Sequence, residues 1–331
     1  MSRKLSSRRR WGAALAGLLG LVAMPATAQE QWPQRPIRLV VPYAPGGGTD
    51  VVARVLAQTM TSQLPHPVVV ENRTGAAGGI GAVEVARSAP DAHTFLFTNN
   101  GYSVLRMLAP NPGLDYYTAL TPITIVTEAP MIMMLANNVP AATLPEFLAL
   151  VRANPGRYDY GSTGTGGTNG LTALMFLQAA NVNINEIPYR GGAPATLDLA
   201  AGRIAMLFDA SSTALATTRG GQARAIAVST AQRSPAAPEV PTLMEAGVPA
   251  SMSIWNAILV PSATPPAQRN ALHAAITRAL GNAELKARFN EFAVDRIPAS
   301  SEAETVRFIA SEVERWESVM RRAEPPAQPP R

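Results

Sequence analysis

The sequence predicts an α/β protein, because short apolar segments rich in β-branched residues alternate with longer amphipathic segments. The short segments have the composition of buried strands, and the longer ones repeat apolar residues at the spacing of one helix face. This alternation favours βαβ units with parallel strands. We expect strands at 37–41, 68–71, 94–97, 123–126, 131–135, 184–187, 206–208, 225–228 and 258–260. We expect helices near 50–63, 79–88, 143–153, 168–180, 193–202, 264–280, 283–292 and 301–322.

Residues 1–28 have the three parts of a secretory signal peptide. Five Arg and Lys residues are followed by an apolar stretch of 14 residues, 11–24, and then by the small-residue sequence ATA at 26–28. A transmembrane anchor is the alternative, but the stretch is shorter than the ~20 residues that span a bilayer. The arginines partly match a twin-arginine signal, so two export routes stay open. We expect a mature periplasmic protein that starts near Gln29.

The mature chain has no net charge. The whole sequence holds 28 Lys and Arg against 23 Asp and Glu, but the signal peptide carries five of the basic residues and no acidic one, which leaves 23 of each. A balanced surface offers no bulk attraction for nucleic acid or for an anionic membrane. We therefore expect no nucleic-acid partner.

The chain of 331 residues contains no cysteine. An exported protein without disulfides depends on sizeable apolar cores, which a hydrophobic content of 47% allows. About 300 mature residues suit two domains. The lack of cysteine excludes a lipoprotein anchor. Since the histidines are not clustered either, we expect no metal and no cofactor.

The most informative segment is PYAPGGGTD at 42–50, between an expected strand and an expected helix. Its glycines leave backbone N–H groups uncovered, and we expect Thr49 or Asp50 to cap the helix. Free N–H groups at a helix N-terminus favour a carboxylate or a phosphate. A plain tight connection is the alternative. Neither a P-loop nor the dinucleotide motif G-x-G-x-x-G is matched.

A second glycine-rich turn, GSTGTGGT at 161–168, precedes the expected helix 168–180. Each half of the chain therefore has one turn of this type. In open α/β sheets, ligands bind outside the carboxyl ends of the strands. The two turns together predict a cleft in which a small anion is held between two lobes.

Other polar residues also follow expected strands. Thr98 and Asn99 could bind ligand oxygens or cap the next helix. Asp209 needs donors, which a helix N-terminus, a ligand hydroxyl or a ligand ammonium could provide. Arg73 could meet a carboxylate or lie on the surface.

No catalytic set emerges from the sequence. The motifs G-x-S-x-G and H-E-x-x-H are absent, and the three histidines are scattered. We therefore expect a binding protein and no enzyme.

Six motifs resemble those of the tripartite tricarboxylate transporter substrate-binding proteins, also called the Bug family. They are PIRLVVPYAPGGGTD at 36–50, VVVENR at 68–73, ARSAPDAHTFL at 86–96, YGS at 160–162, IPYRG at 187–191 and PEVPTLMEAG at 238–247. The resemblance runs in order through the whole mature chain. It implies a two-lobed periplasmic-binding-protein fold, type II-like, with mixed sheets flanked by helices and with two crossover segments.

The resemblance also implies where the lobes begin and end. Segments near 131–135 and 255–261 resemble the crossings of the family. Lobe one is then expected at 29–127 plus 253–331, and lobe two at 128–252.

In the family, the two glycine-rich turns bind a carboxylate through backbone amides, hydroxyls and water. The matching positions are Ala44, Gly47, Gly48, Thr49, Asp50, Ser162, Gly164, Thr165 and Thr168. From the strand ends we add Thr98, Asn99, Tyr189 and Asp209 as expected ligand-binding residues. In relatives that bind amino acids, the position of Asp209 can meet the ammonium group.

The resemblance implies capture of a small organic anion, a mono- or dicarboxylate, for the membrane subunits of a tripartite transporter. We expect a monomer. A ligand-presenting sensor for a two-component kinase shares the fold and stays open as an alternative, whereas an exported hydrolase lacks a visible nucleophile and base. Asn169, Arg190 and the pair Ala76-Ala77 depart from the family pattern, so the ligand's identity stays open.

Overall fold

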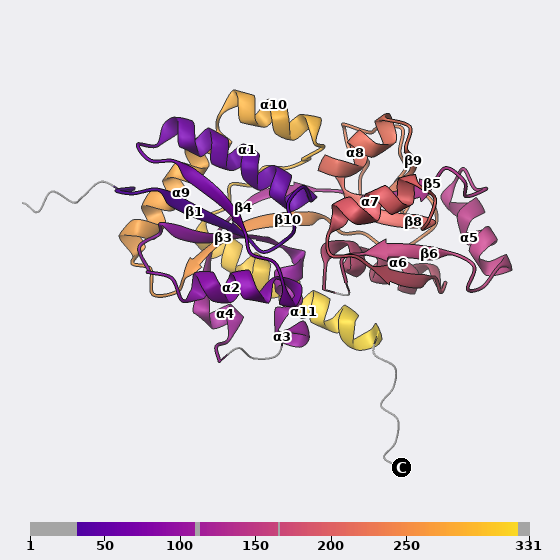
Figure 1. Cartoon of the computed structure of the whole chain (residues 1–331), viewed down its shortest axis with the longest axis horizontal. Coiled ribbons are helices and arrows are strands. Elements are labelled where there is room, and N and C mark those ends of the chain that lie inside the picture. Colours follow the sequence, from indigo (N-terminus) through magenta and orange to yellow (C-terminus); the bar gives the residue numbers. More distant parts are fainter. Residues whose placement is uncertain (1–31, 110–112, 165, 324–331) are drawn as a thin grey trace, which may run out of the picture. The chain divides into compact units, whose positions relative to one another are not determined.

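The computed structural model describes residues 32–109, 113–164 and 166–323, which belong to one compact unit starting at Trp32 (Figure 1). The expected signal peptide at 1–28 and Thr165 lie outside the described residues. Strands and helices alternate as the sequence predicts, and they form two five-stranded sheets flanked by helices. None of the described helices combines the length and the apolar character that a membrane span requires.

The first sheet is built from both ends of the described chain. Its strands are β1 (Ile37–Val41), β2 (Val68–Asn72), β3 (Thr94–Asn99), β4 (Leu120–Ala129) and β10 (Ile254–Pro261), in the order β2-β1-β3-β10-β4. β1 pairs in parallel with β2 and β3, whereas β10 runs antiparallel to β3 and β4. The mixed sheet implied by the resemblance is therefore present. Within this sheet, the parallel pairing suggested by the alternation holds for β1, β2 and β3 and not for β4 and β10.

The second sheet is formed by the middle of the chain. Its strands are β5 (Met131–Ala136), β6 (Asp159–Ser162), β7 (Asn185–Pro188), β8 (Met206–Ala210) and β9 (Ala223–Val228), in the order β7-β6-β8-β5-β9. β6 pairs in parallel with β7 and β8, and β5 runs antiparallel to β8 and β9. The sequence did not predict β6 as a strand, because it has four residues and one of them is Gly161.

Helices cover both faces of the first sheet, so its strands are apolar on both sides. On β1, Ile37 and Leu39 belong to the hydrophobic core on one face of the sheet, and Val40 belongs to the hydrophobic core on the other face. The first face carries α1 (Gly48–Gln63), α9 (Pro266–Leu280) and α10 (Ala283–Glu291). The second face carries α2 (Gly79–Ala86), α4 (Tyr116–Ala119) and part of α11 (Glu302–Ala323). Short helical segments η1 (Ala76–Gly78), η2 (Asn100–Val104) and α3 (Leu105–Leu108) lie between these elements in the chain.

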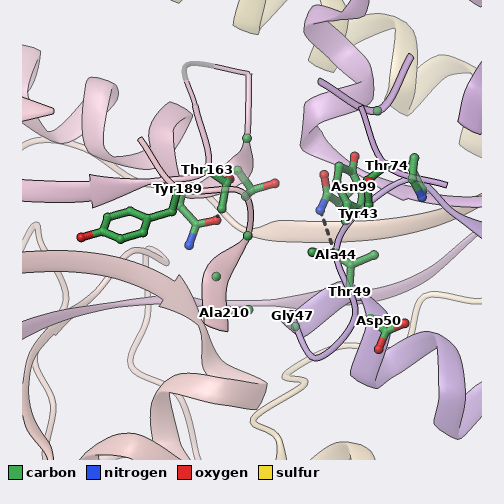
Figure 2. Close-up of a pocket in the computed structure, with 18 of the residues that line it drawn as sticks. Tyr43, Ala44, Gly47, Thr49, Asp50, Thr74, Asn99, Thr163, Tyr189 and Ala210 are labelled. Carbon is green, nitrogen blue, oxygen red and sulfur yellow. Dashed lines mark hydrogen bonds between the residues drawn. The ribbon is translucent and has the colours of Figure 1, made fainter. Parts of the chain in front are cut away.

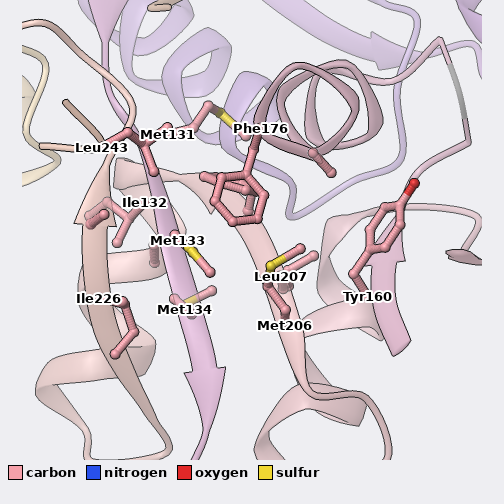
Figure 3. Packing of buried hydrophobic residues seen from close by; sticks show 14 of the residues in the cluster. Met131, Ile132, Met133, Met134, Tyr160, Phe176, Met206, Leu207, Ile226 and Leu243 are labelled. Carbon is pink, nitrogen blue, oxygen red and sulfur yellow. The ribbon is translucent and has the colours of Figure 1, made fainter. Parts of the chain in front are cut away.

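A methionine-rich core holds the second sheet together. Figure 3 shows Phe176 above the side chains of Met133 and Leu207 on neighbouring strands. Its ring centre lies 5.5 Å from that of Phe208. The helices of this half are α5 (Leu144–Ala153), α6 (Thr168–Ala180), α7 (Gly192–Ala200) and α8 (Ser211–Arg219), and the last was not expected from the sequence.

The chain passes between the two sheets at Pro130, which separates β4 from β5, and again between β9 and β10. In addition, α11 packs Ile309 into the core of the first sheet and Trp316 into the core of the second. The lobe boundaries expected at 29–127 plus 253–331 and at 128–252 stay a prediction, and β4 of the first sheet continues past residue 127 to Ala129.

Candidate functional site

A pocket of about 400 Å³ is lined by residues of both sheets and of the turns that follow their strands (Figure 2). This volume lies within the ~300–1,000 Å³ typical of small-molecule sites. The predicted site residues that line it are Ala44, Gly47, Gly48, Thr49, Asp50, Asn99, Thr168, Tyr189 and Asp209.

Helix α1 points its N-terminus at this pocket without a side-chain cap. The helix begins at Gly48, and Gly47 takes the N-cap position with an extended backbone (φ −76°, ψ 162°). The expectation that Thr49 or Asp50 caps the helix is therefore wrong, since both already lie inside its first turn. The first helical hydrogen bond runs from Val51 N–H to the Gly47 carbonyl over 3.0 Å. The N–H groups of the first turn, at Gly48, Thr49 and Asp50, have no helical acceptor and can donate to an anion.

The Thr49 hydroxyl accepts one hydrogen bond and donates none among the described residues. Asn99 Nδ2 donates to Thr49 Oγ1 over 2.7 Å, and Asn99 Oδ1 accepts from Gly101 N–H over 3.0 Å. Asn99 thus caps η2, and it also lines the pocket, where its binding to ligand oxygens stays a prediction. The proton of the Thr49 hydroxyl can be donated to a ligand in the pocket, which Thr49 lines.

Asp50 holds the first turn together. Its carboxylate accepts from Gly46 N–H at 2.9 Å, Arg54 Nε at 2.8 Å and Asn72 Nδ2 at 2.8 Å. Burial raises the pKa of this carboxyl, but the three hydrogen bonds outweigh burial and lower the pKa below its ordinary value. The negative charge at the pocket wall is therefore compensated by Arg54.

Helix α6 presents a second uncapped N-terminus to the same pocket. Gly167 takes the N-cap position (φ −74°, ψ 149°), and the first helical bond runs from Leu171 N–H to Gly167 over 2.9 Å. Only glycine fits there, because a Cβ at Gly167 would lie 1.8 Å from Thr163 Oγ1. The buried Thr168 Oγ1 has no hydrogen-bond partner in the part of the chain that the structure describes. A buried hydroxyl in this state favours a ligand that accepts its proton.

Asp209 lines the pocket with its donors already provided by the protein. It accepts from Ala210 N–H at 2.9 Å, Thr213 Oγ1 at 2.6 Å, and both Asn169 Nδ2 and Thr196 Oγ1 at 3.3 Å. The side chain is buried, and burial raises the pKa of its carboxyl despite these bonds. The donors that Asp209 needs are therefore supplied by the protein itself, through the Ala210 N–H and three side chains, whereas α8 begins after Ala210 without a side-chain cap.

Tyr189 is among the residues that line the pocket, and its hydroxyl is directed elsewhere. The hydroxyl donates to Asp198 Oδ2 over 2.7 Å, and Figure 2 shows it pointing away from Thr49 and Asn99. Burial, followed by the hydrogen bond to Asp198, raises the pKa of Tyr189 to about 12.

Three predicted residues lie behind the pocket wall and not in it. Thr98 Oγ1 bonds to the hydroxyl of Tyr43 over 3.0 Å and so fixes that lining ring. The Ser162 hydroxyl donates to Glu186 and accepts from the N–H of Gly164. Neither Thr98, Ser162 nor Gly164 is among the described residues that line the pocket.

Arg73 lies on the surface, which is the second of the alternatives considered for it. Its guanidinium pairs with Glu71 at 3.0 Å and with Glu84 at 3.3 Å, and it does not line the pocket. The loop that follows does line the pocket, through Thr74, Gly75, Ala77 and Gly78.

The sequence did not point to the apolar part of the wall. Met131 and Ile254 line the pocket at the first residues of β5 and β10, where the chain has just passed between the sheets. Only the sheet pairing brings these two distant positions together. Among the described residues, no group of three or more His, Asp and Glu side chains could hold a metal ion.

Comparison with known proteins identifies the family. The family model described as "Tripartite tricarboxylate transporter family receptor" matches residues 52–324. Protein BugT of Bordetella pertussis is 34% identical over 303 residues, which cover 91% of this chain and 92% of the relative.

Solved structures of similar proteins indicate the same family. The periplasmic binding protein BugD matches with a TM-score of 0.83 and 30% identity, over 88% of this chain and 98% of that one. MatC of Rhodopseudomonas palustris with bound malate matches with a TM-score of 0.81 and 29% identity, over 87% of this chain and 99% of that one. A second R. palustris protein, with adipate, matches with a TM-score of 0.84 and 29% identity, over 88% of this chain and 98% of that one. The chain therefore belongs to the tripartite tricarboxylate transporter family receptors, the periplasmic solute-binding proteins that include the Bug proteins.

Proposed function

We propose that this protein is exported to the periplasm, where it captures a small carboxylate in the pocket for the membrane subunits of a tripartite transporter. The observation that carries the proposal is the pair of uncapped helix N-termini, α1 and α6, which line one pocket from two different sheets. The unpartnered hydroxyl of Thr168 at the second of them supports it. Relatives whose structures contain malate and adipate support the ligand class.

The donors at these two turns are uncharged. Backbone N–H groups and the hydroxyls of Thr49 and Thr168 can satisfy a carboxylate without a buried Arg or Lys, whose own desolvation would be costly. The helix dipoles add a favourable field for the negative charge. The proposed first contact is therefore one carboxylate placed between the starts of α1 and α6.

A thermal-shift screen of small carboxylates, followed by calorimetry on the best ligand, tests this function. We expect Thr49→Ala to weaken binding by roughly 1–2 kcal/mol, since it removes one hydrogen bond to a charged group. Thr49→Asp should abolish binding through like-charge repulsion. Thr49→Ser keeps the hydroxyl and serves as the matched control. Unchanged affinity in Thr49→Asp would remove this turn from the site.

A further inference from the structure

Arg190 is the one charged residue among the described residues lining the pocket that has no partner. Three charged residues line the pocket, namely Asp50, Arg190 and Asp209. Asp50 is paired with Arg54, and Asp209 accepts four hydrogen bonds from its own surroundings. Arg190 is exposed and makes no hydrogen bond or ion pair within the ranges that the structure describes.

The segment that carries Arg190 lies against the first anion-binding turn. A Cβ on the next residue, Gly191, would come within 2.8 Å of Ala44 Cβ, so this segment approaches the turn that precedes α1. The backbone next to Arg190 is therefore close to the turn before α1, and Arg190 lines the same pocket. The apolar side chains of Met131 and Ile254 line the same pocket and suit a short carbon chain.

Arg190 offers the pocket a positive charge with which a second negative group of a ligand can pair. A monocarboxylate held by the uncharged donors of α1 and α6 leaves the positive charge of Arg190 without a counter-ion. Arginine presents paired N–H donors that match the two oxygens of a carboxylate. A second carboxylate at the other end of the ligand satisfies this group.

We propose that Arg190 is a specificity-determining residue that selects dicarboxylates, with one carboxylate at the N-termini of α1 and α6 and the other on the guanidinium of Arg190. This inference rests on the proposed function, since it assigns the second end of the same ligand. It makes Arg190 responsible for the difference in affinity between a dicarboxylate and the monocarboxylate of equal chain length. The contact with the first carboxylate does not depend on it.

Calorimetry with matched ligand pairs tests the assignment. The probes are succinate against butanoate and adipate against hexanoate, which differ only in the second carboxylate. We expect the unmodified protein to bind at least one dicarboxylate about tenfold more tightly than its partner, and Arg190→Gln to remove this difference. Arg190→Lys should restore part of it. Arg307→Gln, an exposed arginine on α11 outside the pocket, makes the same charge change and should keep the difference in full.

The outcomes separate the two proposals. If the unmodified protein binds both members of each pair equally, or if Arg190→Gln leaves the difference intact, the role of Arg190 is wrong while carboxylate capture stands. If Arg190→Gln weakens both members of a pair equally, Arg190 acts on the first carboxylate or on the fold, which also overturns the inference. If neither pair nor any other carboxylate binds, the proposed function fails, and the inference fails with it.

Discussion

Thr168 connects the stability of the ligand-free protein with ligand binding. Its buried hydroxyl has no partner among the described residues and lines the pocket. Thr168→Val keeps the branched shape and removes the hydroxyl. We expect this change to leave the free energy of unfolding of the ligand-free protein unchanged or higher by up to about 1 kcal/mol, and to lower carboxylate affinity about tenfold. Chemical denaturation and calorimetry measure the two effects.

Thr172→Val is the control on the same helix. Thr172 is buried one turn further along α6, where its hydroxyl donates to the Thr168 carbonyl over 2.7 Å and does not line the pocket. Its replacement should leave affinity unchanged. A Thr168→Val protein that binds as well as the unmodified one would show that this hydroxyl does not meet the ligand.

Asp209 distinguishes plain carboxylates from amino acids. Asn at this position can accept from Ala210 N–H and Asn169 through its oxygen and donate to the hydroxyls of Thr196 and Thr213 through its nitrogen. We expect Asp209→Asn to fold and to bind a plain carboxylate with equal or higher affinity, because one negative charge is removed from the wall. A loss of ~1.5–3 kcal/mol in calorimetry would instead indicate a ligand ammonium or hydroxyl at Asp209.

At the scale of elements, the approach of α1 to α8 depends on Gly48. A Cβ there would lie 2.4 Å from Ala210 Cβ and 2.8 Å from Ser212 Oγ. We expect Gly48→Ala to lower ligand affinity at least about tenfold with little loss of thermal stability, because the added methyl group meets α8 at the wall of the pocket. The clash lies between elements of different sheets, and so it affects the pocket more than either core.

Gly47→Ala is the matched control for this prediction. The nearest atom to a Cβ at Gly47 is the Ala44 carbonyl oxygen at 3.6 Å, and its φ of −76° suits alanine. Calorimetry and thermal denaturation of the two variants decide the question. Equal affinities in Gly48→Ala and in the unmodified protein would contradict the close approach of the two helices.

The sequence predicted most elements because their apolar periodicity is strong, and it missed those that tertiary contacts create. Helix α8 is rich in serine and threonine, which favour caps and turns over helix interiors. It is held by Asp209 at its start and by the burial of Ala214 and Leu215. Strand β6 forms because β7 and β8 flank it.

The candidate site was also predicted only in part, because local patterns can be read from the sequence and tertiary contacts cannot. Glycine-rich turns before helices can be read along the chain, and both turns line the pocket. Side-chain pairings between distant residues cannot be read in this way. The bond from Asn99 to Thr49 depends on how α1 packs on the first sheet, and the approach of Gly191 to Ala44 depends on how the two sheets are placed.

At the scale of the whole molecule, ligand binding should close the protein around the pocket. Residues of the two sheets already touch there, since Gly48 lies against Ala210 and Gly191 against Ala44. One carboxylate can be satisfied by α1 and α6 together only in such an arrangement, so the ligand should bind it better than an open one. Small-angle scattering should give a smaller radius of gyration at saturating ligand. An unchanged radius would argue against closure.

The most direct test of carboxylate capture is a crystal structure of the mature protein with the best ligand of the thermal-shift screen. We predict one carboxylate within hydrogen-bond distance of the N–H groups at the start of α1 and of α6, and of the hydroxyls of Thr49 and Thr168. A ligand whose carboxylate contacts neither helix N-terminus, or one that binds outside this pocket, would contradict the account.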